Sequence, residues 1–366
     1  MNESRLLNLK SDKNKTHLNY RVVNVDQLIC GESIGSFLLL NQMMKTQQAD
    51  QSFKMLASRE LQFNRLIDNW SQSFIYFRGD KAKRSIEQIN ERISLIEFEN
   101  DALFYKDQKL RSFGGRANPL KMLEFEKYFI SKPFTFDSST LFEENFANSC
   151  SQYFLEGKLI SISKNDDKDW VLKCSDGLEV VTPNLYWGES RKSLFELLDN
   201  DIKDSLSEEE LAVFGDLQEC SVLNVTFELN KPITEKSQTF FIPQSQTHEW
   251  GHFVLDFHSP KSNRQTVVGH IFIYDTDVDE EFLGRKIKLL KRNTDRVLAG
   301  FQKAITEEKI VHLDEFWCDF SAPDELDKHD ISKLPALIGS QSLVSKKNFE
   351  ESEYPFLLNE LRTFTK

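Results

Sequence analysis

The segment VDQLICGESIGSFLLLNQMMKTQQADQSFKMLA, residues 25–57, carries the pattern on which the fold prediction rests. A short apolar strand is expected at 25–30, followed by the small-residue turn GESIG. Apolar residues at helical spacing then predict a helix over 34–47, and FKMLA at 53–57 has the composition of a second strand. A strand, a tight turn, a helix and a strand make a βαβ unit, which favours a parallel sheet.

The composition restricts the classes of protein to which the chain can belong. Its 366 residues suffice for two or three domains of ~100–200 residues each. The formal net charge of −12 argues against nucleic acid or an anionic membrane surface as a partner. No apolar run approaches the ~18–20 residues of a membrane span, and the N-terminal residues lack the apolar core of a secretory signal. Five scattered cysteines suit reduced, buried thiols. We therefore expect a cytoplasmic protein that binds a small molecule or another protein.

The stretch HEWGHFVLDFH at 248–258 contains the letters of a zinc-protease helix. On a helix, His248 and His252 would share a face, and Glu249 could act as the base on a metal-bound water. Apolar residues alternate with period two over 253–257, however, which predicts a strand. On a strand the two histidines would stand about 13 Å apart, at ~3.3 Å per residue, too far for one metal ion. We predict no metal site here, and a zinc hydrolase is the third functional hypothesis.

The order of the segments after the βαβ unit resembles that of a known family. A helical insertion is followed by a β-meander containing SDGLEVVTPNLYWGES at 175–190, then by an antiparallel sheet, a long helix and an apolar strand ending at Gly339. This order resembles the flavin-containing amine oxidase and phytoene desaturase-like superfamily over most of residues 20–366. The resemblance implies an α/β fold with a discontinuous Rossmann-like FAD/NAD(P)-binding domain of the glutathione-reductase type. It also implies a substrate-type domain with an antiparallel sheet and helices.

Residues 1–17 are polar, so a loose N-terminal arm is expected there. The resemblance implies how the rest of the chain is divided. The FAD/NAD(P)-binding-like domain is expected to comprise residues 18–60, 140–195 and 311–366, and the substrate-type domain residues 61–139 and 196–310.

The family's dinucleotide loop, GxGxxG, corresponds here to CGESIG. Its glycines allow a tight turn, a close approach of the pyrophosphate and contact between helix and strand. Aligning Cys30 with the first glycine places Gly35 at the third, but it puts Glu32 at the second, where a carboxylate would crowd and repel a pyrophosphate. Aligning Gly31 with the first glycine puts Ser33 at the second and leaves the loop one residue short.

Two further family features depart from the pattern. The acid expected after the second strand for the ribose hydroxyls is absent from Leu56-Ala57-Ser58, and Glu60 follows two positions late. The family's final Gly-Asp is Gly339-Ser340 in this chain. The resemblance implies no catalytic residue, and it implies these cofactor-binding residues: Gly31, Ser33, Ile34, Gly35, Glu60, Gly339 and Ser340.

Two main functions remain open. One is a flavin-dependent oxidoreductase that oxidises a C–N or C–C bond of an amine or apolar substrate, with FAD at the helix start near Ser33. The other is a relative without a cofactor that serves as a binding or scaffold protein. In that case Glu32 takes the place of the phosphate at the helix start. The three departures favour the second function, as does a glycine content of 14 in 366, about 4 per cent against the usual ~7 per cent.

Overall fold

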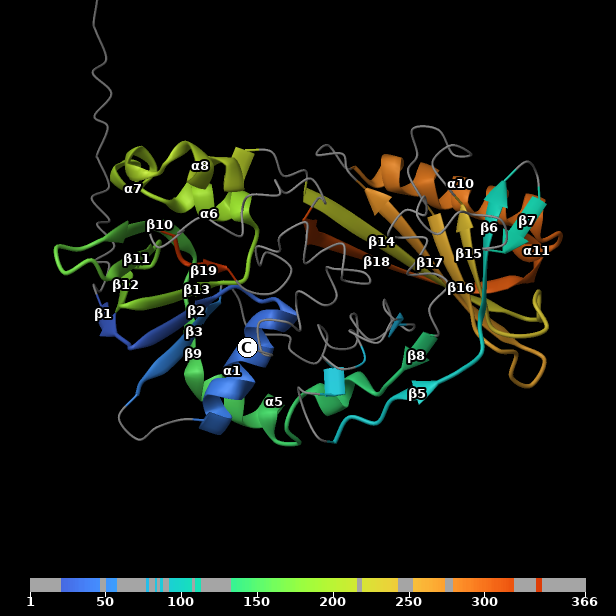
Figure 1. Ribbon diagram of the computed structural model, residues 1–366, viewed down its shortest axis with the longest axis horizontal. Helices are drawn as coiled ribbons and strands as arrows, with labels where there is room; N and C mark the ends of the chain where they lie inside the picture. The colour runs from blue at the N-terminus through green and yellow to red at the C-terminus, as the bar shows by residue number, and fades with distance from the viewer. Residues whose placement is uncertain are drawn as a thin grey trace, which may run out of the picture.

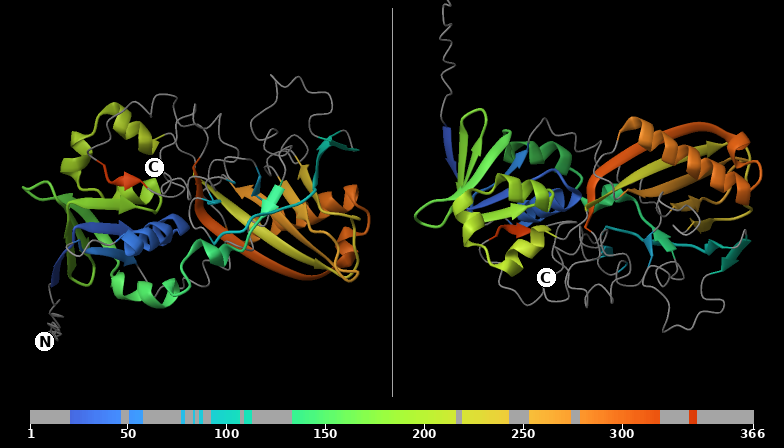
Figure 2. Two further views of the ribbon diagram at one scale, coloured as in Figure 1. Left: turned by 60° about the horizontal axis from the view of Figure 1, so that its bottom comes forward. Right: turned by 90° about the horizontal axis from the view of Figure 1, so that it is seen from above.

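The part of the chain that the structure describes forms two lobes, each built around its own β-sheet (Figure 1). In Figure 2 the same two lobes lie side by side when the molecule is turned. The computed structural model describes residues 21–46, 51–57, 77–78, 83, 86–87, 92–106, 109–112, 133–215, 219–242, 253–273, 279–318 and 334–337.

The first lobe is built on a five-stranded parallel sheet in the order β19-β13-β2-β3-β9. Its strands are β2 (Gln27–Cys30), β3 (Phe53–Ala57), β9 (Phe154–Glu156), β13 (Asn184–Trp187) and β19 (Ala336–Leu337). If the five strands are numbered 1 to 5 in chain order, as β2, β3, β9, β13 and β19, their order across the sheet from the β9 edge is 3-2-1-4-5. Doubly wound nucleotide-binding sheets have this order. Helix α1 (Ile34–Thr46) joins β2 to β3. The predicted α/β fold and its βαβ unit are therefore confirmed.

A second, smaller sheet lies in the same lobe. Three antiparallel strands form the predicted meander, and β1 (Arg21–Asn24) adds to it in parallel with β12. The meander strands are β10 (Leu159–Lys164), β11 (Trp170–Cys174) and β12 (Leu178–Thr182). Three helices follow β13 in the chain: α6 (Arg191–Leu197), α7 (Asn200–Ser205) and α8 (Glu208–Gly215). Ser207 and Glu210 cap α8 reciprocally, since each backbone N–H donates to the other's side chain.

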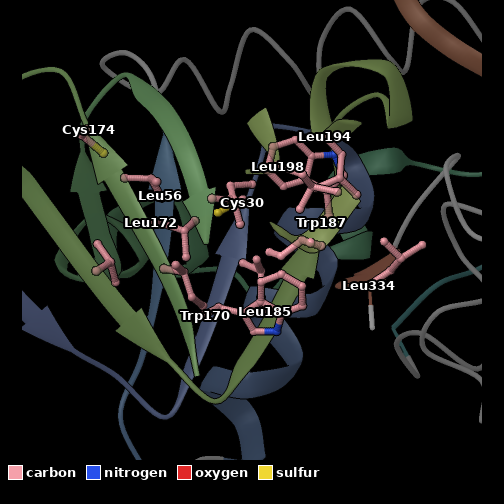
Figure 3. Packing of buried hydrophobic residues seen from close by; sticks show 14 of the residues in the cluster. Cys30, Leu56, Trp170, Leu172, Cys174, Leu185, Trp187, Leu194, Leu198 and Leu334 are labelled. Atoms are coloured by element: carbon pink, nitrogen blue, oxygen red, sulfur yellow. The ribbon is translucent and has the colours of Figure 1, made fainter. Parts of the chain in front are cut away.

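One apolar core holds these layers together (Figure 3). Cys30 and Trp187 come from the parallel sheet and Leu172 from the meander, and all three are almost fully buried. The helices contribute Leu194, Leu198, Ile202 and Leu206 to the same core. Residues 195 and 196, between which a domain boundary is expected, both lie in α6.

The second lobe is built on a seven-stranded sheet in the order β18-β14-β17-β16-β15-β6-β7. All neighbouring strands are antiparallel except β15 and β6. The strands are β6 (Asp101–Lys106), β7 (Lys109–Ser112), β14 (Glu219–Leu229), β15 (Gln238–Ile242), β16 (Phe253–Phe257), β17 (Gln265–Ile273) and β18 (Ile305–Cys318). The boundary expected between residues 310 and 311 falls inside β18, which pairs with β14 over most of its length.

Helices α10 (Glu280–Val297) and α11 (Phe301–Ala304) cover one face of this sheet (Figure 2). Side chains alternate across a sheet, so one set of alternate residues forms the core under α10. Phe227, Phe253 and Leu290 are among its fully buried members. The helix lies close to the strands, because a Cβ at Gly269 would lie 2.8 Å from Leu290 Cδ2. The opposite face of the sheet carries the complementary set of side chains.

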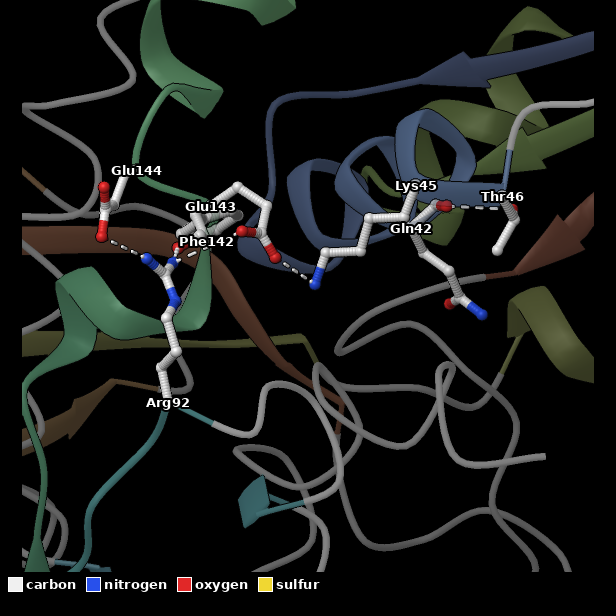
Figure 4. A network of polar contacts seen from close by, with 7 residues as sticks. All are labelled: Gln42, Lys45, Thr46, Arg92, Phe142, Glu143 and Glu144. Carbon is white, nitrogen blue, oxygen red and sulfur yellow. Dashed lines mark hydrogen bonds and ion pairs between the residues drawn. The ribbon is translucent and has the colours of Figure 1, made fainter.

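Short elements connect the two lobes. A three-stranded sheet contains β4 (Phe77–Arg78), β8 (Pro133–Thr135) and β5 (Ile96–Glu97), and the short helices η2 (Ser138–Leu141), α5 (Phe146–Ser149) and η3 (Cys150–Tyr153) lead to β9. Glu143 accepts from Lys45 of α1 at 2.6 Å and pairs with Arg92 at 3.8 Å, so it links α1 to the insertion (Figure 4). Among the described helices, none has the length and apolar character needed to cross a bilayer.

Candidate functional site

The strand order of the parallel sheet reverses between β2 and β13. In doubly wound sheets, ligands bind in the crevice at the carboxyl ends of the strands at this point. β2 ends at Cys30 and β13 at Trp187, and a glycine follows each strand. The Gly188 N–H donates to the Cys30 carbonyl at 2.8 Å, so the two chain segments meet directly at the crevice. The turn GESIG, predicted to hold the cofactor, therefore lies at the place where the fold binds ligands.

Gly31 has a backbone conformation that requires glycine. Its φ is +107°, which L-residues with a Cβ rarely adopt. A Cβ at this position would lie 2.9 Å from the backbone nitrogen of Glu189 and 2.9 Å from the carbonyl carbon of Gly188. It would also lie 2.6 Å from Cγ of Glu189. The space above Gly31 is thus filled by the segment that follows β13.

Ser33 caps α1. Its Oγ accepts a hydrogen bond from the backbone N–H of Ser36 at 3.1 Å, and its carbonyl accepts from Phe37 N–H. Gly35 is buried in the first turn of the helix, while the side chain of Ile34 lies outside the described part. The positive end of the helix dipole therefore points at the crevice, and the Ser33 hydroxyl already satisfies one of its N–H groups.

Replacing Ser33 with alanine should lower the free energy of unfolding by about 1 kcal/mol, because the capping acceptor is lost. Ser33→Thr is the matched control, since it keeps the hydroxyl and should change stability much less. Urea denaturation of the two variants and the wild type measures the effect. Equal losses in both variants would show that the hydroxyl does not stabilise the helix start.

The charges around the turn are acidic. Glu32 is half-buried within the turn, and the exposed Glu189 lies against Gly31. Burial raises the pKa of the Cys30 thiol well above its usual value, and the charges of Glu189 and Cys174 raise it further. Cys30 is therefore a protonated, unreactive thiol at neutral pH. The acidic Glu189 lies against Gly31 and its charge acts on Cys30, so a diphosphate that approached this turn would meet negative charge, which is electrostatically unfavourable.

The other predicted site residues fall outside the described residues. Glu60 follows β3, which ends at Ala57, and Gly339 and Ser340 follow β19. The zinc-like residues at 248–252 also lie outside them, whereas the strand predicted at 253–257 is confirmed as β16. Within the described part of the chain, no group of three or more His, Cys, Asp or Glu side chains could hold a metal ion.

A buried polar row in the second lobe was not identified from the sequence. It lies on the face of the seven-stranded sheet opposite α10 and consists of Asn224, His270, Asp256 and Thr239, each from a different strand. The sequence carries only a weak signal for it: Asp256 and His270 each interrupt an apolar run, at positions that strand alternation can place on one face. That signal becomes readable only when the order of the strands is known.

Comparison with known proteins supports the fold. No family model matches the sequence, and no curated protein matches it. The structure is similar to putrescine oxidase bound to putrescine, at 8% identity and a TM-score of 0.59, covering 94% of this chain and 99% of that one. It is also similar to cyclohexylamine oxidase from Brevibacterium oxydans, at 7% identity and a TM-score of 0.59, covering 93% and 100%. A protein assigned as a protoporphyrinogen oxidase from Exiguobacterium matches at 10% identity and a TM-score of 0.60, covering 95% and 98%. The chain therefore has the fold of FAD-dependent oxidoreductases.

Proposed function

We propose that this chain is a binding protein built on the flavin-oxidoreductase fold, and that its dinucleotide turn does not hold FAD. The observation that carries the proposal is the close approach of Glu189 to Gly31, because this acidic residue occupies the space above the glycine at the crevice. A flavin protein needs hydrogen-bond donors and little side-chain bulk at this position, because the pyrophosphate approaches the backbone closely. Here the crevice carries side chains of the same sign of charge as the ligand.

The substrate-type lobe supports the binding role. Its sheet keeps a buried polar row on the face opposite α10. Burying a polar side chain lowers the stability of the fold unless the side chain forms hydrogen bonds. Buried polar side chains therefore either bond to one another or serve a binding role. A binding protein could therefore keep this lobe while the cofactor turn changes.

The decisive measurement is the visible absorption spectrum of the purified protein, followed by thermal unfolding with added FAD. We expect a colourless protein whose unfolding midpoint does not change with FAD. A true site would stabilise the fold by about 2.7 kcal/mol when FAD is present at 100 times its dissociation constant. A yellow protein, or a midpoint that rises with FAD, would overturn the proposal.

The variant Glu32→Gly restores the family residue at the second glycine position. We expect it to destabilise the protein mildly without creating affinity for FAD, because the ribose acid and the terminal Gly-Asp are also missing from the sequence. Fluorescence titration with FAD measures the affinity. Binding that tightens tenfold or more in Glu32→Gly would show that this carboxylate alone keeps the flavin out.

The second candidate is a flavin-dependent oxidoreductase acting on an amine or apolar substrate. It is favoured by the 3-2-1-4-5 strand order, by the helix start at Ser33 and by the similarity to amine oxidases over nearly the whole chain. In that protein FAD would supply the redox chemistry, and the chain would hold its diphosphate at Ser33 and Gly35. The absorption spectrum separates the two candidates in one measurement.

A further inference from the structure

The outer face of α10 carries a line of cations, although the formal net charge of the chain is −12. Lys288, Arg292 and Arg296 are all exposed and follow one another at intervals of four residues. At 3.6 residues per turn and ~1.5 Å per residue, they share one face of the helix and stand about 6 Å apart along it. We call these three residues the basic row. In Figure 1, α10 lies on the outside of the second lobe.

The cations of the basic row differ from their neighbours on α10. Arg285 pairs with Glu281 one turn earlier, and Lys291 pairs with Glu308 of β18 at 2.8 Å. Among the residues that the structure describes, the side chains of the basic row form no ion pair. Their charges are therefore available to a group outside the chain.

An exposed apolar side chain lies beside the same helix. Ile310 of β18 is 51% exposed. It is on the α10 side of the sheet, because it is paired in register with Val225, which belongs to the core under that helix. Val225 is paired in turn with Gly269, over which Leu290 of α10 packs. Ile310 therefore lies at the edge of the sheet, level with the middle of α10.

The spacing of the basic row fits the carboxylates of a second helix. Acidic residues at every fourth position of a helix also repeat at ~6 Å, so one partner helix can place a carboxylate opposite each cation. Arginine can bind a carboxylate through two parallel hydrogen bonds, which adds geometric specificity to the charge. An apolar side chain on the flank of the partner helix would cover Ile310 and remove its exposed surface from water.

An anionic membrane fits this surface less well than a helix does. A bilayer would meet a broad area of the lobe at once, including the exposed acids Glu280 at the start of α10 and Glu307 on β18. A helix is only ~10–12 Å wide with its side chains, so it can contact the basic row without approaching these acids. The arrangement of charges therefore favours a narrow protein segment.

We propose that the basic row and Ile310 form a docking surface for an acidic amphipathic helix of a partner protein. The partner helix carries carboxylates at every fourth position and an apolar side chain on one flank. The inference goes beyond the proposed function, because it concerns the second lobe and holds whether or not the crevice at Gly31 binds FAD.

The test is a fluorescence anisotropy titration of the full-length protein against a fluorescein-labelled helical peptide. The peptide is alanine-based and about 20 residues long, which is enough for helix formation, with three glutamates at every fourth position and leucines along one flank. One comparison peptide has glutamine in place of each glutamate. Another keeps the same composition but distributes the glutamates around the helix.

Three protein variants separate the docking surface from general charge effects. In the test variant all three cations of the basic row become glutamine, which favours a helix about as well. The control variant combines Arg21→Gln, Lys158→Gln and Lys192→Gln, which removes the same charge from exposed positions of the first lobe. Ile310→Thr removes apolar surface but keeps a β-branched side chain in the strand. Circular dichroism checks that each variant is folded.

We expect the glutamate-row peptide to bind saturably and to bind the test variant about tenfold more weakly, because three exposed ion pairs are lost. Ile310→Thr should weaken binding about threefold through the lost apolar contact, and the control variant should stay within about twofold of the wild type. Both comparison peptides should bind the wild type more weakly than the glutamate-row peptide.

Three results would overturn the proposal. The first is the absence of saturable binding by the glutamate-row peptide. The second is equal binding of the peptide with redistributed glutamates, or equal losses in the test and control variants, since net charge alone would then explain the attraction. The third is binding to phosphatidylserine vesicles that the test variant loses, without binding to the peptide, which would assign the surface to a membrane. None of these results depends on FAD, so the absorption spectrum tests the proposed function separately.

Discussion

Replacing Asp256 with alanine is expected to lower the free energy of unfolding by about 1–3 kcal/mol, the usual cost of removing one partner from a buried hydrogen bond. The carboxylate accepts from Thr239 and faces the ring of His270 at 3.4 Å. Without the carboxylate, both of these contacts are lost from the interior of the sheet. Urea denaturation followed by circular dichroism measures the change.

Two variants serve as controls for Asp256. Asp101 forms an exposed pair with Lys236 at 2.6 Å, and Asp101→Ala should cost less than about 1 kcal/mol because water screens that pair. Asp256→Asn keeps the volume and an acceptor for Thr239 but loses the charge, so its loss should lie between the two. If Asp256→Ala were no more harmful than Asp101→Ala, the polar row would not be the buried, coupled unit described above.

The second large effect is expected at Gly31. Gly31→Ala should destabilise the fold by about 2–6 kcal/mol, because a strained backbone at positive φ costs ~1–3 kcal/mol and overpacking adds ~1–3 kcal/mol. The new Cβ would approach backbone atoms of Gly188 and Glu189, which cannot turn aside as a flexible side chain does. The crevice between β2 and β13 would have to open. Thermal and urea unfolding measure the loss.

Gly284 is the matched control for Gly31. It lies inside α10, and a Cβ built on it meets no atom within 4 Å. Gly284→Ala should therefore stabilise the protein by up to about 1 kcal/mol, because alanine favours the helix more than glycine does. The same substitution is thus expected to lower stability at Gly31 and to raise it at Gly284. A loss at Gly284 equal to that at Gly31 would contradict the steric argument.

The sequence by itself determined the local elements and their order. Period-two alternation predicted β16, and helical spacing after a small-residue turn predicted α1, because these periodicities follow from backbone geometry alone. The reciprocal capping contacts of Ser207 and Glu210 are also local, since the two residues are only three positions apart. The resemblance to flavin amine oxidases supplied the α/β architecture that strand order and similar structures support.

Only the tertiary structure decided which distant segments meet. Glu189 is 158 positions from Gly31 in the sequence, and no periodicity indicates that it fills the space above that glycine. Apolar residues from the helical segment 191–215 join the core of the first lobe, a long-range contact that no local pattern indicates. The polar row has the same origin: Asn224 and His270 are 46 residues apart, and strand pairing alone aligns them. Register between strands depends on long-range packing, so a local pattern cannot encode it.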